Sequence, residues 1–142
     1  MLGALSATVV VLAGLGTGCG SSSDDYANAD RPPAPISISI AVTGTRVAVA
    51  PSHVGAGPVL LLIANESSRS RDVTLRTPDG SSSACVKDDA SSGPINPQGA
   101  AHIQLSLVEG TCEVGVADGS LPPTRLVVGP QRASAQQDLL QP

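Results

Sequence analysis

The sequence predicts an all-β protein, a two-sheet Greek-key sandwich of about seven or eight short strands. Apolar and polar residues alternate with period two in several short runs, and turn signals separate those runs by roughly 8–12 residues. The 142 residues include 15 glycines and 12 prolines, which suits a turn-rich β protein. No run shows the periodicity of an amphipathic helix.

The first predicted strand is Ile36–Val42, where isoleucines and a valine alternate with serines and an alanine. A second short run, Val47–Val49, ends at Pro51. A loop through His53 and Gly55 is expected to follow.

The stretch Gly57–Thr77 organises the rest of the chain. It opens with the unbroken apolar run Val59–Ala64, passes through the polar hexad Asn65–Ser70, and continues as an alternating segment that contains Val73 and Leu75. We expect a hairpin of two paired or neighbouring strands, the first central and buried on both faces, the second buried on one.

After this hairpin the sequence predicts a short strand, Ala84–Lys87, that carries Cys85, and a long loop, Asp88–Gly99, rich in glycine and proline. Three strands complete the sandwich, because alternation returns in the C-terminal half of the chain. They are Ala100–Val108, a run through Cys112, Val114 and Val116, and Arg125–Gly129.

The composition limits the kinds of ligand. Hydrophobic residues make up 41% of the chain but aromatic residues only 1%, and Tyr26 is the only one. The core must therefore consist of Val, Ile, Leu and Ala, and sites that stack sugars or bases on aromatic rings are not expected. The net charge of −4 has the wrong sign for a phosphate-binding surface, which argues against nucleic acid as a partner.

The N-terminal stretch Leu2–Leu15 is apolar, uncharged and too short to span a bilayer, and small residues lead from it to Cys19. This pattern resembles the lipobox of bacterial lipoproteins, in which the cysteine takes a diacylglycerol and becomes the mature N-terminus. The chain departs from that pattern at Gly16, where leucine is usual, and in having no basic residue before the apolar run. An ordinary cleaved secretory signal and a retained anchor are the alternatives.

From this resemblance we predict four segments: a signal peptide (1–18), a lipidated cysteine with a flexible tether (19–35), the β-sandwich (36–129), and a C-terminal tail (130–142) that is disordered or forms a short helix. The protein is then exported and anchored at the outer face of the bacterial cell membrane or in the cell envelope. Its expected partners are membrane lipid, through the anchor, and an envelope protein.

With Cys19 assigned to lipid, two cysteines remain, and exported proteins usually pair their cysteines. We therefore predict a disulfide between Cys85 and Cys112. Two buried free thiols are the alternative.

No set of residues predicts catalysis, and we expect that the protein is not an enzyme. His53 and His102 are the only histidines and lack the spacing of metal ligands, so no catalytic, cofactor-binding or metal-binding residue is predicted. Arg69, Arg71 and Arg76 are expected to form the only basic patch, made either of solvated turn charges or of a surface for an anionic partner.

Two regions of the chain resemble cupredoxins. That family often has a proline, a Gly-x-Val strand, an asparagine and a His-Asp-Val motif, and later a Gly-Thr-Tyr motif, the copper cysteine and a closing strand. The matching positions here are Pro51, Gly57–Val59, Asn65, Arg71–Val73, Gly110–Cys112, Val116 and Leu126–Gly129. The resemblance implies a cupredoxin-like sandwich; an immunoglobulin-like sandwich is the alternative.

The copper ligands of that family are not carried over. Arg71 stands at the position of the first histidine, Val116 stands at the position of the cysteine, and neither His nor Met follows Val116. We therefore expect a non-catalytic binding or structural module, with contact loops at Ser52–Gly57, Asp88–Gly99 and Asp118–Pro123. The alternative is a degenerate copper-handling protein related to electron-transfer cupredoxins, using His53, His102 or thiols in another arrangement.

Overall fold

The computed structural model describes residues 32–134. The predicted signal peptide, Cys19, most of the tether and the end of the C-terminal tail lie outside that range. The described part contains eight strands: β1 (Ile36–Val42), β2 (Val47–Ala50), β3 (His53–Asn65), β4 (Arg71–Arg76), β5 (Ala90–Ile95), β6 (Ala100–Leu107), β7 (Gly110–Val116) and β8 (Thr124–Gln131). Within it there is no helix of the length and apolarity that a membrane span requires.

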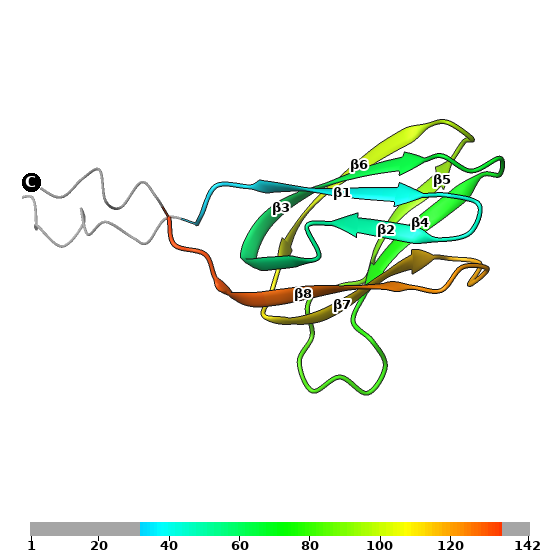
Figure 1. Cartoon of the computed structure of the whole chain (residues 1–142). Coiled ribbons are helices and arrows are strands. Elements are labelled where there is room, and N and C mark those ends of the chain that lie inside the picture. Colours follow the sequence, from blue (N-terminus) through cyan, green and yellow to red (C-terminus); the bar gives the residue numbers. More distant parts are fainter. Residues whose placement is uncertain (1–31, 135–142) are drawn as a thin grey trace, which may run out of the picture.

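The strands form two sheets that share β3 (Figure 1). Sheet A has the order β2-β1-β3-β6, and β1 and β3 are parallel. Sheet B has the order β8-β7-β4-β5, and the first four residues of β3 add to the outer side of β8. The predicted fold class, an all-β sandwich of seven or eight strands, is confirmed.

The strand β3 changes sheet at Gly57. It runs parallel to β8 up to Ala56, where a bulge interrupts the register, and then runs parallel to β1. Gly57 has a φ of 127°, and a Cβ there would meet Pro33 Cγ at 2.8 Å. Only glycine suits this corner, because a side chain would be both strained and without space.

The guanidinium of Arg132 closes this corner from the C-terminal side. It donates hydrogen bonds to the carbonyl oxygens of Ala34 at 2.8 Å and Gly55 at 3.2 Å, and to that of Pro58. The segment before β1, the corner of β3 and the segment after β8 therefore meet at one end of the sandwich, which we call the termini end (Figure 1).

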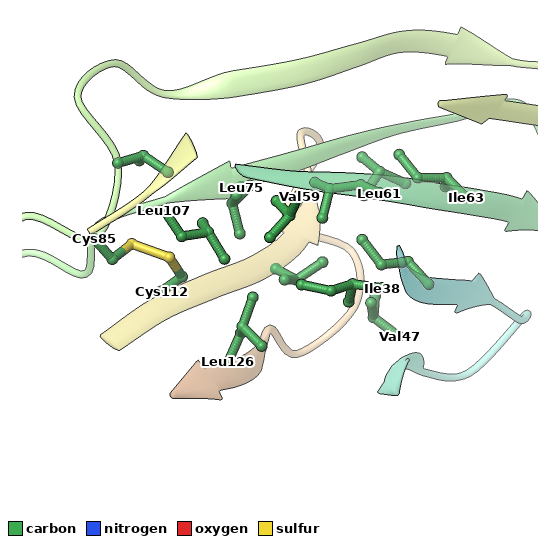
Figure 2. Close-up of a cluster of buried hydrophobic side chains, with 14 of the residues drawn as sticks. Ile38, Val47, Val59, Leu61, Ile63, Leu75, Cys85, Leu107, Cys112 and Leu126 are labelled. Carbon is green, nitrogen blue, oxygen red and sulfur yellow. A yellow bond between two sulfur atoms is a disulfide. The ribbon is translucent and has the colours of Figure 1, made fainter. Parts of the chain in front are cut away.

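Aliphatic side chains from both sheets and one disulfide fill the core (Figure 2). The largest side chains with less than 2% exposure include Ile38, Leu61, Leu75 and Leu126. In each strand the buried positions alternate with more exposed ones, as the pleat of a strand requires. Burial of these side chains supplies the main driving force for folding.

Two predictions about the central stretch are wrong. The segments Val59–Ala64 and Val73–Leu75 do not form a hairpin, because β3 pairs with β1 and β6 whereas β4 pairs with β5 and β7 in the other sheet. The connection between them crosses from sheet A to sheet B. The apolar run of β3 is central but buried on only one face, and Leu62 is 43% exposed.

Three local assignments also change. His53 and Gly55 belong to β3 and not to a loop. Ala84–Lys87 is not a strand, and the strand β5 lies instead within the predicted loop Asp88–Gly99. The β5 sequence has no apolar alternation, so its conformation depends on its pairing with β4.

Candidate functional site

Four connections gather at the end of the sandwich opposite the termini end (Figure 1). They join β1 to β2, β3 to β4, β5 to β6 and β7 to β8, and their residues are 43–46, 66–70, 96–99 and 117–123. We call this set the loop end. It is also where the cupredoxin resemblance implies the metal ligands.

A buried asparagine organises the loop end. Asn65, at the end of β3, is 1% exposed, and its amide nitrogen donates to the carbonyl oxygens of Arg69 at 2.7 Å, Ile95 at 2.9 Å and Asn96 at 3.2 Å. Its side-chain oxygen accepts hydrogen bonds from the backbone amide and hydroxyl of Ser67. The Asn65 side chain therefore joins the end of sheet A to the loop 66–70 and to the end of β5.

The sequence Asn65-Glu66-Ser67 matches the N-glycosylation sequon, but the side-chain amide of Asn65, which would accept the sugar, is buried.

A buried arginine extends this network across the loop end. Arg71 is 7% exposed, and its Nη1 lies 2.6 Å from Ser120 Oγ and 3.3 Å from an Asp118 carboxylate oxygen. Its Nε donates to Ser67 Oγ at 3.4 Å. The guanidinium thus links the start of β4 to the loop between β7 and β8, and buried guanidinium groups require such partners.

The carboxylate of Asp118 is 59% exposed, so only one member of the ion pair is buried. Hydrogen bonds from the backbone amide and then the hydroxyl of Ser120 lower the pKa of this carboxyl, and the charges of Arg71 and Arg69 lower it further. Asp118 therefore stays ionised and the guanidinium keeps its counter-ion.

The residues at the loop end do not fit a type 1 copper site. That site needs two imidazoles and a thiolate, but the position of the first imidazole holds a guanidinium, which has no free lone pair to ligate. The position of the thiolate holds Val116, which is 6% exposed. Residues 32–134 contain no group of three or more His, Cys, Asp and Glu side chains that could hold a metal ion.

The two histidines lie elsewhere on the sandwich. His53 is exposed at the start of β3, where its Nδ1 is 3.1 Å from Ser52 Oγ. His102 is exposed on the outer face of β6 and is opposite Leu62 in the register.

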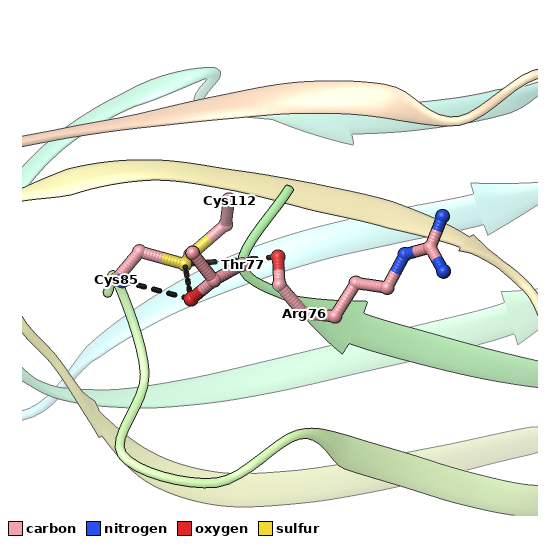
Figure 3. The surroundings of a disulfide bond; sticks show 4 residues. All are labelled: Arg76, Thr77, Cys85 and Cys112. Carbon is pink, nitrogen blue, oxygen red and sulfur yellow. Dashed lines mark hydrogen bonds between the residues drawn. A yellow bond between two sulfur atoms is a disulfide. The ribbon is translucent and has the colours of Figure 1, made fainter. Parts of the chain in front are cut away.

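The predicted disulfide between Cys85 and Cys112 is confirmed (Figure 3). The two Cα atoms are 5.5 Å apart, and both residues are fully buried. Thr77 Oγ1 accepts a hydrogen bond from the Cys85 backbone amide at 3.1 Å, and the Cys85 sulfur lies 3.7 Å from the Arg76 carbonyl oxygen. That last approach is a contact and not a hydrogen bond, because a disulfide sulfur carries no proton. Both thiols of the described domain are therefore covalently occupied.

The predicted basic patch is wrong. Arg71 is buried in the network described above, whereas Arg76 lies at the other end of β4 and is 3.4 Å from Glu113. Arg69 is exposed in the loop between β3 and β4. The length of β4 separates Arg76 from the other two, and of those two Arg71 is buried whereas Arg69 is exposed, so the three do not form one exposed patch.

The predicted contact loops are corrected in part. Ser52–Gly57 is not at the loop end, because from His53 onward it is the first part of β3. Only the end of Asp88–Gly99, residues 96–99, reaches the loop end as a loop. Asp118–Pro123 is there as predicted, and beside it a pocket of about 510 Å³ opens on the outer face of sheet B. Its polar lining includes Thr74, Arg76, Asp89 and Ser91.

The comparisons with known proteins show similarity to copper proteins at low identity. No protein-family model and no curated protein sequence matches the chain. Among solved structures, auracyanin A, a "blue" copper protein from the green thermophilic photosynthetic bacterium Chloroflexus aurantiacus, is similar with a TM-score of 0.48 and 15% identity, over 68% of this chain and 100% of that chain. Reduced auracyanin from the photosynthetic bacterium Roseiflexus castenholzii has a TM-score of 0.46 and 11% identity, over 70% of this chain and 100% of that chain.

A multicopper oxidase, mgLAC, is similar with a TM-score of 0.41 and 12% identity, over 75% of this chain and 42% of that chain. All three TM-scores are below 0.5, so these similarities assign no function to this chain. The sandwich architecture rests on the strand pairing described above.

Proposed function

We propose that this chain is a non-catalytic lipoprotein of the bacterial cell envelope that acts by contact with another envelope component. The observation that carries the proposal is the position of Arg71. Its guanidinium fills the place at which the resemblance implies a copper imidazole, and Ser67, Asp118 and Ser120 hold it there. A charged, hydrogen-bonded network at that position stabilises the loops and offers no ligand to a metal.

The proposed anchor is a lipid on Cys19. The apolar segment Leu2–Leu15 and the small residues before Cys19 support export and lipidation. The Cys85–Cys112 disulfide supports an oxidising compartment outside the cytoplasm, because structural disulfides are rare in reducing compartments.

The proposed contact surface is the loop end, together with the pocket beside residues 117–123. Loops on a rigid scaffold are common binding surfaces. Tyr26 is the only aromatic residue of the chain and residues 32–134 contain none, so the loop end has no aromatic anchor for a partner. We therefore expect a small, polar interface of modest affinity, and the negative net charge makes nucleic acid an unsuitable partner.

Metal titration of the purified protein tests this function against the copper-handling alternative. We expect neither Cu(I) nor Cu(II) to bind at one equivalent with a dissociation constant below about 1 μM, because Arg71 and Val116 replace two ligands. The variant Arg71→Leu is the matched control, since it removes the guanidinium without adding a ligand and should not bind either. One tightly bound equivalent with an intense thiolate charge-transfer band would overturn the proposal.

Fractionation of cells tests the anchor separately. We expect the wild-type chain in the membrane fraction and the Cys19→Ser variant in the soluble exported fraction, because the serine cannot form the thioether to lipid. Mass spectrometry of the mature N-terminus provides the direct measurement. An unmodified N-terminus beyond Cys19 would contradict the lipoprotein assignment without affecting the conclusion about copper.

A further inference from the structure

The sandwich has four strand edges, and three of them are poor templates for another strand. The edge strand β2 has only four residues before Pro51. The first part of β3 pairs with β8 over four positions and is interrupted by a bulge. The edge strand β5 contains Gly93 and Pro94, and its register with β4 is also irregular. Short edges, prolines and bulges are the features with which natural sheets prevent unwanted pairing.

The fourth edge, β6, has none of these features. It pairs with β3 over eight consecutive positions without a register shift, from Gly57↔Leu107 to Ala64↔Ala100. Its sequence, AAHIQLSL, contains no proline, no glycine and no Asp, Glu, Lys or Arg. Within residues 32–134 no strand pairs with its other side, so every second residue presents unpaired backbone groups there.

The inward side chains of β6 are also incompletely covered. In β3, Val59 and Leu61 are each 1% exposed. Their neighbours in the register, Leu105 and Ile103, point to the same face but are only half-buried. The difference indicates that apolar surface remains open along the outer side of β6, where one more strand would cover it.

The occupant must be compatible with an uncharged edge in a chain of net charge −4. The adjacent edge of sheet B, the strand β5 (ASSGPI), also lacks charged residues. A second copy of this chain meets that requirement, because two neutral edges can approach while the charged residues of each copy stay apart. We propose that β6 pairs antiparallel with β6 of a second copy about a two-fold axis, which joins two sheets A into one continuous sheet.

This arrangement keeps both cores on the same side of the joined sheet. A two-fold axis perpendicular to an antiparallel strand pair places residues of the same face opposite each other, so Ile103 lies near Ile103 of the second copy and His102 near Gln104. The contact between the two β6 strands is about 26 Å long and includes side chains on both faces of the joined sheet. It therefore buries on the order of 400 Å² per copy. That area is at the low end for specific interfaces, so the dimer should be weak in solution and favoured by confinement on a membrane.

The antiparallel pairing places the two termini ends on opposite sides of the dimer. Residues 20–35 number sixteen and can extend to about 55 Å, so both copies can reach the same membrane if Cys19 is lipidated. The dimer itself does not require the anchor. Its test therefore stands apart from the tests of the proposed function.

Sedimentation of the purified full-length protein in detergent, over about 1–200 μM, measures the association. We expect a monomer–dimer equilibrium with a dissociation constant in the tens of micromolar, given the small contact area. The double variant His102→Lys with Gln104→Lys places lysines opposite each other across the axis, and should raise the dissociation constant at least about tenfold. The matched control is Ser37→Lys with Ser39→Lys, two exposed positions on the same face of β1, which should leave the constant unchanged.

Crosslinking in membranes gives a second measurement that does not depend on detergent. Under mild oxidation a mixture of His102→Cys and Gln104→Cys chains should form an intermolecular disulfide, because these two positions lie opposite each other across the axis, whereas Ser39→Cys should not. A protein that remains monomeric, a dimer that the β6 lysines do not weaken, or assemblies larger than a dimer would each overturn the proposal.

Discussion

The two sheets of this sandwich differ in their charged residues and in the links that hold their strands. None of the four strands of sheet A contains Asp, Glu, Lys or Arg, and apart from the corner of β3 their registers are continuous. Sheet B contains Arg71, Asp72, Arg76, Glu113 and Arg125, the disulfide, and an irregular register between β4 and β5. Both sheets contribute aliphatic side chains to the same core, but only sheet B adds covalent and ionic links.

Apolar burial alone does not explain this difference, because both sheets bury aliphatic side chains in the core. In sheet A, β1 and the second half of β3 provide two adjacent runs of buried isoleucine, leucine and valine, whose burial stabilises that sheet. In sheet B the strand β5 contributes little apolar surface, because only Ile95 of its six residues is buried. The disulfide and the Asn65–Arg71 network hold that side in place, and each variant below removes one of these contributions.

The largest expected effect is on sheet B. Replacing both bridged cysteines, in Cys85→Ala with Cys112→Ala, should lower the free energy of unfolding by about 3.5 kcal/mol, because the bridge closes a loop of 27 residues in the unfolded chain. Urea unfolding followed by far-ultraviolet circular dichroism measures the change. A loss below about 1 kcal/mol would show that the core alone holds sheet B, and the contrast between the sheets would fail.

A core truncation in sheet A comes next. Leu61→Ala should lower the free energy of unfolding by about 3 kcal/mol, because Leu61 is 1% exposed and its loss leaves a cavity. Leu62→Ala, at the adjacent position with 43% exposure, is the control and should cost less than about 1 kcal/mol. Equal losses in the two variants would contradict the burial of only one face of β3.

The polar connection between the sheets should matter somewhat less. Asn65→Ala removes three hydrogen bonds to backbone carbonyls and the two that Ser67 donates to the Asn65 side chain, and we expect a loss of about 2 kcal/mol. Asn96→Ala changes an exposed asparagine that takes part only through its backbone, and should stay within about 0.5 kcal/mol of wild type. Thermal unfolding of the three proteins side by side provides the comparison.

The smallest effect concerns pH. The pKa of Asp118 is lower in the folded protein than its usual value of 3.8, so its contribution to stability is present above that value and disappears as the pH falls through the folded pKa. Asp118→Asn should therefore show a shallower loss of stability between about pH 4 and pH 2 than wild type. Asp79→Asn, in an exposed turn, controls for the removal of one negative charge. Identical pH profiles for Asp118→Asn and wild type would show that the loop-end ion pair does not contribute.

The strands that sequence reasoning predicted well are those with clear alternation. Ile36–Val42 and Ala100–Val108 were recognisable because each has one apolar face. The run Val59–Ala64 was assigned to a strand, but an unbroken apolar run does not specify which face is covered, and the exposed face became evident only from the packing. The sequence of β5 does not predict a strand, because it consists mainly of serine, glycine and proline without apolar alternation. The segment is a strand because it pairs with β4 and because Val73 N donates a hydrogen bond to Ser92 Oγ.

The loop-end network could be predicted only in part. The resemblance places Arg71 where the cupredoxin family has a metal ligand, and this difference in residue type is visible in the sequence itself. Its burial could not be predicted, because the partners Asp118 and Ser120 lie 47 and 49 residues further along the chain. The disulfide was easier to predict, since cysteine parity needs no knowledge of the fold.

The parallel pairing of β1 with β3 has a mechanical consequence. β1 begins at the termini end and finishes at the loop end, with β2 on one side and β3 on the other. A pull on the chain before Ile36, against a contact held at the loop end, acts along the axis of β1. The register pairs from Ile36↔Val59 to Val42↔Asn65 are then loaded in shear and must break together, not one after another. A sandwich attached in this way is a stiff link between whatever holds its two ends.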